Sequence, residues 1–170
     1  MKAIVSAYNF LILALAVVAG AAIGLAFVLI VVDVSLRATG FMPPAFTSAV
    51  VEYVLLYFTL FCAPYLLRKK GHVYVDALIA TLPPRARRVV EKIAFTICVA
   101  TSLVFAFIGF RLFFEAIQSG AIEERSIDVA AWISYLPVGP VFVILAIEFG
   151  RYLIGLDVMY ADRTQAKESL

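Results

Sequence analysis

Histidine, cysteine and charged residues are all scarce in this 170-residue chain, and each shortage excludes a class of function. A single histidine, His72, cannot supply the paired axial ligands of a membrane haem. The two cysteines, Cys62 and Cys98, stand alone in apolar sequence, so they form neither a C-x-x-C redox motif nor part of a zinc-ligand cluster. We therefore predict that the chain is not an enzyme and holds no catalytic residue, cofactor or metal.

Charge is scarce because four long apolar stretches occupy most of the chain. Only 15% of the residues are charged and 64% are hydrophobic, a balance that is not found in soluble domains of this size. The stretches cover about residues 10–34, 48–68, 90–114 and 129–153. Each is long enough to cross a hydrocarbon core of about 30 Å as a helix. Since hydrocarbon cannot satisfy open backbone groups, a helix is the conformation that these stretches must adopt.

The sequence therefore predicts an all-α integral membrane protein with four transmembrane helices, organised as a single membrane domain over residues 1–170. The first apolar run is longer than the core of a signal peptide, so we interpret it as a retained helix. Seven of the 14 Lys and Arg residues lie between residues 68 and 92, whereas the two other loops together hold three. The positive-inside rule then places the N- and C-termini in the cytoplasm.

The basic loop between the second and third spans contains a short amphipathic pattern at about residues 72–82. Its apolar residues recur at helical spacing, while His72 and Asp76 fall largely on another side. A segment this short cannot span the bilayer, so we predict an interfacial helix. His72 and Asp76 are four residues apart, but no nucleophile or phosphate loop lies nearby. We interpret them as residues that anchor the second helix or dock a partner.

Two further features point to packing rather than chemistry. Gly20 and Gly24 form a smooth groove on the first helix, which would pack either on this chain's own helices or on a partner chain. Glu52 opens the second span, on the same side of the membrane as Arg37. A carboxylate at the end of a span usually has a partner, so we predict an Arg37–Glu52 ion pair. The alternative is that Glu52 carries protons.

A resemblance to a known family rests on motifs spread over most of the chain. They are Asp33-x-x-x-Arg37, Glu52 at the start of the second span, the run RKKGHVYVD at residues 68–76, and YLPVG at residues 135–139. The chain resembles the small permease subunit of TRAP (tripartite ATP-independent periplasmic) transporters. The sequence departs from the family pattern just before Glu52 and at the entry to the last span.

This resemblance implies a multi-pass protein of the bacterial inner membrane. Its partners would be a large membrane subunit that binds sodium and substrate, a periplasmic solute-binding protein and membrane lipid, with no nucleic acid. The cargo would be an organic acid: a dicarboxylate, a sugar acid or a sulfonate. The chain would scaffold the large subunit and help dock the binding protein. By the same resemblance, Arg37, Glu52, Arg68, His72 and Asp76 would be interface and anchoring residues. The alternative is an independent small proton-coupled carrier that uses Glu52.

Overall fold

The computed structural model describes residues 2–69, 84–124 and 127–154. Four helices within these residues are long and apolar enough to cross a membrane, which confirms the prediction of four such helices. The long helices are α1 (Lys2–Ala38), α2 (Phe46–Arg68), α4 (Pro84–Ser119) and α6 (Val138–Ile154), and the one-turn helix α5 (Trp132–Tyr135) precedes α6. The predicted interfacial helix, with His72 and Asp76, lies outside the described residues, and the side of the membrane that the termini occupy stays a prediction.

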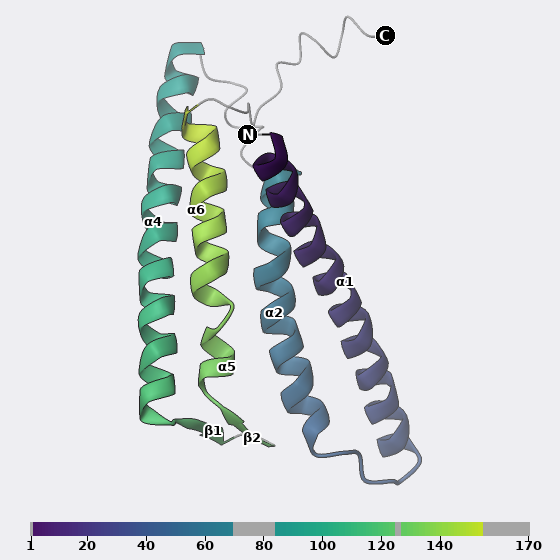
Figure 1. The fold of residues 1–170 in the computed structure, drawn as a ribbon. Coiled ribbons are helices and arrows are strands. Elements are labelled where there is room, and N and C mark those ends of the chain that lie inside the picture. The colour runs from purple at the N-terminus through teal and green to yellow at the C-terminus, as the bar shows by residue number, and fades with distance from the viewer. Residues whose placement is uncertain (1, 70–83, 125–126, 155–170) are drawn as a thin grey trace, which may run out of the picture.

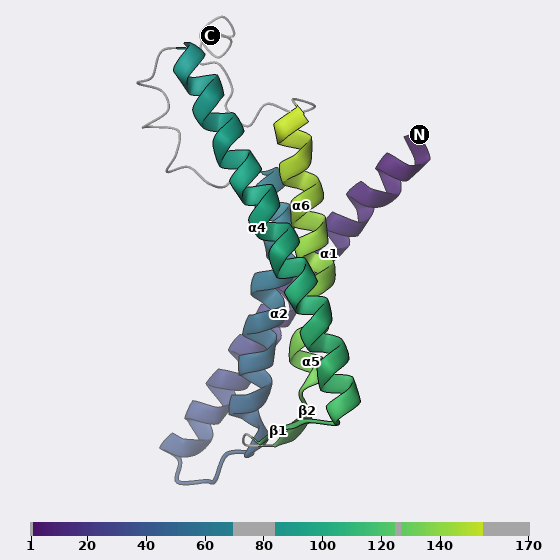
Figure 2. The same ribbon diagram turned by 90° about the vertical axis from the view of Figure 1, so that its left-hand side faces the viewer.

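The four long helices stand side by side in the order α4, α6, α2, α1 (Figure 1). α4 packs on α6, α1 packs on α2, and the contact between α2 and α6 joins the two pairs. Viewed along this row, α4 and α1 lean in opposite directions, so the layer is twisted (Figure 2). The chain thus forms one twisted layer of helices and not a closed bundle. Two broad faces and two edge helices are left to meet lipid or other chains.

Buried residues recur every seventh position along the two outer helices. On α1 the seam is Ile12, Ala19 and Ala26, each 1% exposed. On α4 it comprises buried Phe95, Ser102, Gly109 and Ala116. A seven-residue repeat keeps one side of a helix against its neighbour. Most of these residues are small, and small side chains let membrane helices approach closely.

The helices α4 and α6 approach each other closely at two glycines. A Cβ atom added to Gly109 would lie 2.8 Å from the backbone nitrogen of Gly139, and one added to Gly139 would lie 2.9 Å from the ring of Phe110. Neither position therefore has room for a side chain. The sequence alone marks Gly109 only as a tolerated helical glycine, whereas the structure requires it.

The last span is interrupted, as the prolines and glycine of its first part predict. α5 ends at Tyr135 and α6 begins at Val138, with Pro137 between them. Between α4 and α5 the predicted short acidic loop contains a small antiparallel hairpin of β1 (Ile122–Glu124) and β2 (Asp128–Ala130). Its register pairs Ile122 with Ala130 and Glu124 with Asp128. The hairpin follows Gly120, whose positive φ of 62° ends α4.

Candidate functional site

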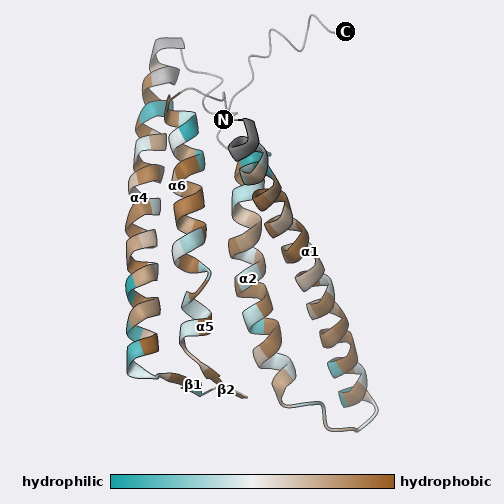
Figure 3. Ribbon diagram, viewed as in Figure 1, coloured by the Kyte–Doolittle hydropathy of each residue, from teal (hydrophilic) through white to brown (hydrophobic). Residues whose placement is uncertain are grey.

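Each span contains a long run without Asp, Glu, Lys or Arg. The uncharged runs cover residues 10–32, 53–67, 93–110 and 129–147. In Figure 3 apolar colouring predominates along the long helices, and the helix ends carry most of the strongly hydrophilic positions. The polar contacts that join different helices lie accordingly in two clusters, one at each end of α2. We call them the Glu148 network and the Glu123 network.

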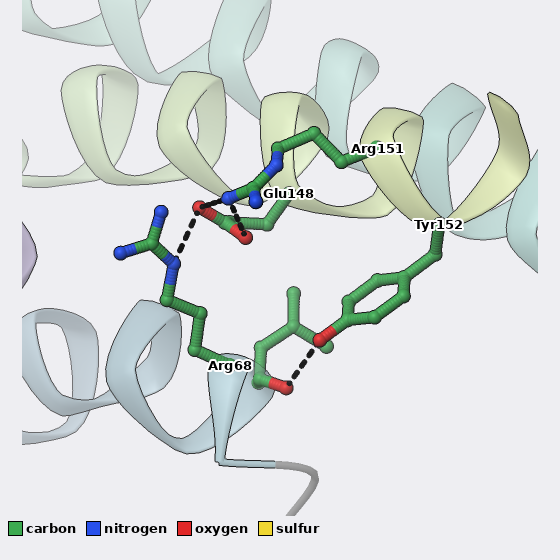
Figure 4. A network of polar contacts seen from close by, with 5 residues as sticks. Arg68, Glu148, Arg151 and Tyr152 are labelled. Atoms are coloured by element: carbon green, nitrogen blue, oxygen red, sulfur yellow. Dashed lines mark hydrogen bonds and ion pairs between the residues drawn. The ribbon is translucent and has the colours of Figure 1, made fainter. Parts of the chain in front are cut away.

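The Glu148 network is centred on a carboxylate that is only 1% exposed (Figure 4). Its Oε1 atom lies 3.1 Å from Nε of Arg68 at the end of α2. Nη1 of Arg151, one turn further along α6, donates to both oxygens of Glu148 at 3.2 Å. Glu148 and Arg151 are three residues apart, so helical geometry brings them to one face of α6. The bridge to Arg68 links α6 to α2, which the sequence does not indicate.

Aromatic side chains extend this network to the other two helices. The guanidinium of Arg68 lies 5.1 Å from the ring centre of Tyr8 on α1. The hydroxyl of Tyr152 donates to the carbonyl of Leu67 at 3.2 Å, and its ring stacks on Phe95 of α4 with a centroid distance of 5.6 Å. All four long helices therefore meet around one buried carboxylate.

The electrostatics of the Glu148 network favour a fixed geometry. A buried carboxylate is stable only when charged or polar donors satisfy its oxygens, and here two guanidinium groups from two helices do so. Loss of either partner would leave charge in a low-dielectric region. The network thus fixes the end of α2 against α6, although a buried ion pair adds little net stability by itself.

The Glu123 network holds the opposite end of α2. The hydroxyl of Tyr53 donates to Oε2 of Glu123 in β1 at 2.9 Å, and Ser134 of α5 donates to Oε1 at 3.1 Å. One turn along α2, the hydroxyl of Tyr57 donates to the carbonyl of Ile133 at 2.7 Å. The hairpin and α5 are therefore bonded to α2, although the chain places them more than 60 residues later.

An apolar groove lies between the two networks. It has a volume of about 230 Å³ and lies between α1 and α2. It is formed by Val18, Ala19, Ala22, Tyr53, Val54, Tyr57, Phe58 and Phe61. Such a groove cannot compensate a charged solute for the loss of water. It fits hydrocarbon instead.

Two other predicted site residues, Arg37 and Glu52, lie near the connection between α1 and α2. Arg37 is largely exposed and its Nε atom pairs with Oδ2 of Asp33 at 2.7 Å, one turn earlier on α1. Glu52 is exposed near the start of α2. The Arg37–Glu52 pair stays a prediction. Arg68, by contrast, is a predicted site residue that the structure places in a network between helices.

Gly20 and Gly24 do not pack on the described helices of this chain. Both are exposed, and a Cβ atom added to either would meet nothing within 4 Å. The packing seam runs instead through Ala19 and Ala26 of the same helix. Packing of the Gly20–Gly24 groove on the described helices of the chain is therefore excluded, and packing on a partner chain stays a prediction.

Sequence reasoning missed the residues whose partners are distant in the chain. Tyr8, Tyr53, Glu123 and Tyr152 bond or stack across gaps of many residues, so helical spacing gives no signal for them. A weaker signal did exist: tyrosines near the ends of spans have hydroxyl groups that need a partner when they are partly buried. Glu123, in contrast, is one of several acidic residues in a loop, and only the hairpin distinguishes it.

Four apolar helices with polar contacts between them near their ends define a multi-pass membrane protein. The Glu148 network and the Glu123 network hold its elements together. Residues 26–153 match the family model described as tripartite ATP-independent periplasmic transporters, DctQ component. The chain therefore belongs to the DctQ family, the small membrane component of TRAP transporters, which is not an enzyme family. None of the curated proteins compared with the chain matches it.

Proposed function

We propose that this chain is the stationary scaffold subunit of a sodium-coupled TRAP transporter in the bacterial inner membrane. It would support a large subunit that carries sodium and an organic acid, such as a dicarboxylate, a sugar acid or a sulfonate. A periplasmic binding protein would deliver the acid. The observation that carries the proposal is the bonding of α2 at both ends, through Arg68 to Glu148 and through Tyr53 to Glu123. Such a layer resists deformation between its two halves.

Two further features support a scaffold over a carrier. The spans have no ionisable group at mid-membrane, and a polar solute or a cation needs such groups to leave water. The described helices are continuous through the middle of the membrane, whereas carriers commonly place their sites at broken helices near the midplane. The interruption at Pro137 lies near the end of the last span. Sodium and solute would therefore bind in the large subunit.

Orientation and docking follow from the distribution of charge. With both termini in the cytoplasm, the Glu148 network faces the cytoplasmic side and the hairpin faces the periplasm. The hairpin then presents the exposed carboxylates of Glu124 and Asp128 where a binding protein would dock. The Asp33–Arg37 pair at the end of α1 would lie on the same side. We assign these end regions to docking and the exposed Gly20–Gly24 face of α1 to the large subunit.

Solute uptake by reconstituted vesicles tests the proposal. Vesicles with the chain and its large subunit, supplied with binding protein and a sodium gradient, should accumulate an organic acid. Vesicles with the chain alone should accumulate none, with or without a proton gradient. Proton-driven uptake by the chain alone, abolished by Glu52→Gln, would instead support the independent carrier. Glu52 is exposed near a helix end, and this position does not favour the independent proton-coupled carrier.

A further inference from the structure

The Glu148 network carries an excess of positive charge. Two guanidinium groups, those of Arg68 and Arg151, share one carboxylate, so the three side chains have a net charge of +1. Both arginines contact the same oxygen, Oε1, which brings them close to each other. Their side chains are only 21% and 34% exposed. Partly buried excess charge is costly unless another anion balances it.

The donors that remain in the network point away from the carboxylate. Arg68 uses Nε for Glu148, and Figure 4 shows its two terminal nitrogens directed to the other side. Arg151 uses Nη1. Within the described residues, no hydrogen bond engages the terminal nitrogens of Arg68 or the Nη2 atom of Arg151. The hydroxyl of Tyr8 is buried as well, and within the described residues no hydrogen bond engages it.

Exposed apolar side chains flank this charge on the described parts of α6 and α1. Ile147 and Ile154 lie four residues before and three residues after Arg151, so all three share one face of α6. Ile147 is 48% exposed and Ile154 is 76% exposed. Leu11, one turn from Tyr8 on α1, is exposed as well. A ligand with an anionic head and a hydrocarbon tail would satisfy both parts of this surface.

We propose that Arg68 and Arg151 bind the phosphate of an anionic phospholipid at the cytoplasmic surface of the membrane. A guanidinium group binds phosphate through two parallel N–H groups, and the network presents two such groups with a positive balance. Basic recesses between transmembrane helices at this depth bind lipid head groups. The acyl chains would lie along the exposed face of α6. The inference rests on the proposed orientation and on the proposed pairing with a large subunit, but not on transport activity, so lipid binding and solute uptake can fail independently.

Alternative anions are distinguished by their chemistry. A free phosphate ion would gain nothing from the apolar face of α6, so it should bind more weakly than a lipid. A carboxylate of the large subunit would fill the same site, but it would then exclude added lipid from the assembled complex. Phosphatidylcholine carries the same phosphate with a compensating cation, and the excess positive charge of the network should disfavour it.

Lipid binding to the intact complex tests the site. The full chain, purified with its large subunit and depleted of lipid, is titrated with phosphatidylglycerol or with phosphatidylcholine of the same acyl chains, and bound lipid is counted by native mass spectrometry. The intact complex should prefer phosphatidylglycerol. Arg151→Gln should weaken binding of phosphatidylglycerol about tenfold, since a hydrogen bond to a charged group contributes about 1.5–3 kcal/mol. Lys92→Gln, which removes an exposed cation from α4 near the same end, should leave it unchanged.

Each remaining outcome counts against the site. Equal affinity for the two lipids, or equal affinity of the Arg151→Gln and unsubstituted complexes for phosphatidylglycerol, would overturn it. Displacement of the lipid by millimolar inorganic phosphate would show a site for free anions. Arg151→Lys keeps a cation beside Glu148 and so protects folding. Because lysine lacks the paired N–H groups, this variant should also weaken lipid binding, and an unchanged affinity would contradict the proposed geometry.

Discussion

At the scale of single residues, substitution of Glu148 should strongly lower the free energy of unfolding. Glu148→Gln leaves Arg68 and Arg151 partly buried without their shared carboxylate, and breaking such a pair costs about 3–5 kcal/mol. We expect a fall of several degrees in the melting temperature of the purified protein. Glu115→Gln, at an exposed position on α4, is the matched control and should melt unchanged. Equal melting of the two variants would mean that the network does not hold α2 to α6.

The Glu123 network makes a comparable prediction at the other end of α2. Glu123→Ala removes the acceptor of both Tyr53 and Ser134, and an unsatisfied buried donor costs about 1–3 kcal/mol. Thermal melting should show this loss. The neighbouring Glu124→Ala, on the exposed side of the same strand, should be close to neutral. If both substitutions lower the melting temperature equally, the negative charge of the loop stabilises the fold and the specific hydrogen bonds of Glu123 do not.

How much of these contacts could be predicted depends on the sequence separation of the partners. The Glu148–Arg151 and Asp33–Arg37 pairs lie three and four residues apart on one helix, so helical geometry alone brings them together. Arg68 meets Glu148 across two helices whose contact the sequence does not specify. The same holds for Tyr53 and Glu123. Local pairs were therefore predictable, whereas the joints between helices were not.

At the scale of the helices, the approach of α4 to α6 should be sensitive to one methyl group. Gly109→Ala places a Cβ atom against the backbone of Gly139, which cannot move aside as a side chain can. Overpacking of this kind costs about 1–3 kcal/mol, so we expect a clear fall in melting temperature. Gly150→Ala on α6 meets nothing within 4 Å and should be neutral or slightly stabilising. A neutral Gly109→Ala would show that α4 and α6 are less closely packed than described.

The helices themselves were largely predictable, and the elements between them were not. Long uncharged runs in a lipid environment permit only helices, and Pro137 cannot donate a backbone hydrogen bond, so the interruption between α5 and α6 was expected. The β1–β2 hairpin has strands of three residues each, too short for an alternating pattern to be recognised. Its register depends on bonds to α2 and α5 that lie far along the chain.

At the scale of the whole molecule, the open face of α1 should mediate assembly. Gly20→Leu combined with Gly24→Leu fills a face that touches no described part of this chain, so the chain itself should still fold. If that face receives the large subunit, the two bulky side chains should sharply reduce co-purification. Val17→Leu, an exposed position on α1 that is already apolar and branched, is the control. Unchanged recovery of the large subunit with both variants would exclude this face as the interface.

The order of the helices in the layer is the part of the fold that the sequence could not supply. Lipid is as apolar as leucine, so hydrophobicity does not select which faces meet. The pattern of small residues drew attention to Gly20 and Gly24, yet the seam with α2 uses Ala19 and Ala26, whose side chains lie around the helix from them. Both sets satisfy the rule for close packing. Only the contacts made by the neighbouring helix distinguish them.

The attachment of α2 at its two ends has a mechanical consequence. A helix bonded to its neighbours at one end can tilt about that end, whereas a helix bonded at both ends cannot tilt without losing the contacts at one end. The two attachment points, Tyr53 and Arg68, are 15 residues apart on α2, about 22 Å along its axis. A sideways force from a moving neighbouring subunit could therefore tilt α2 only if the contacts at one of its two ends broke.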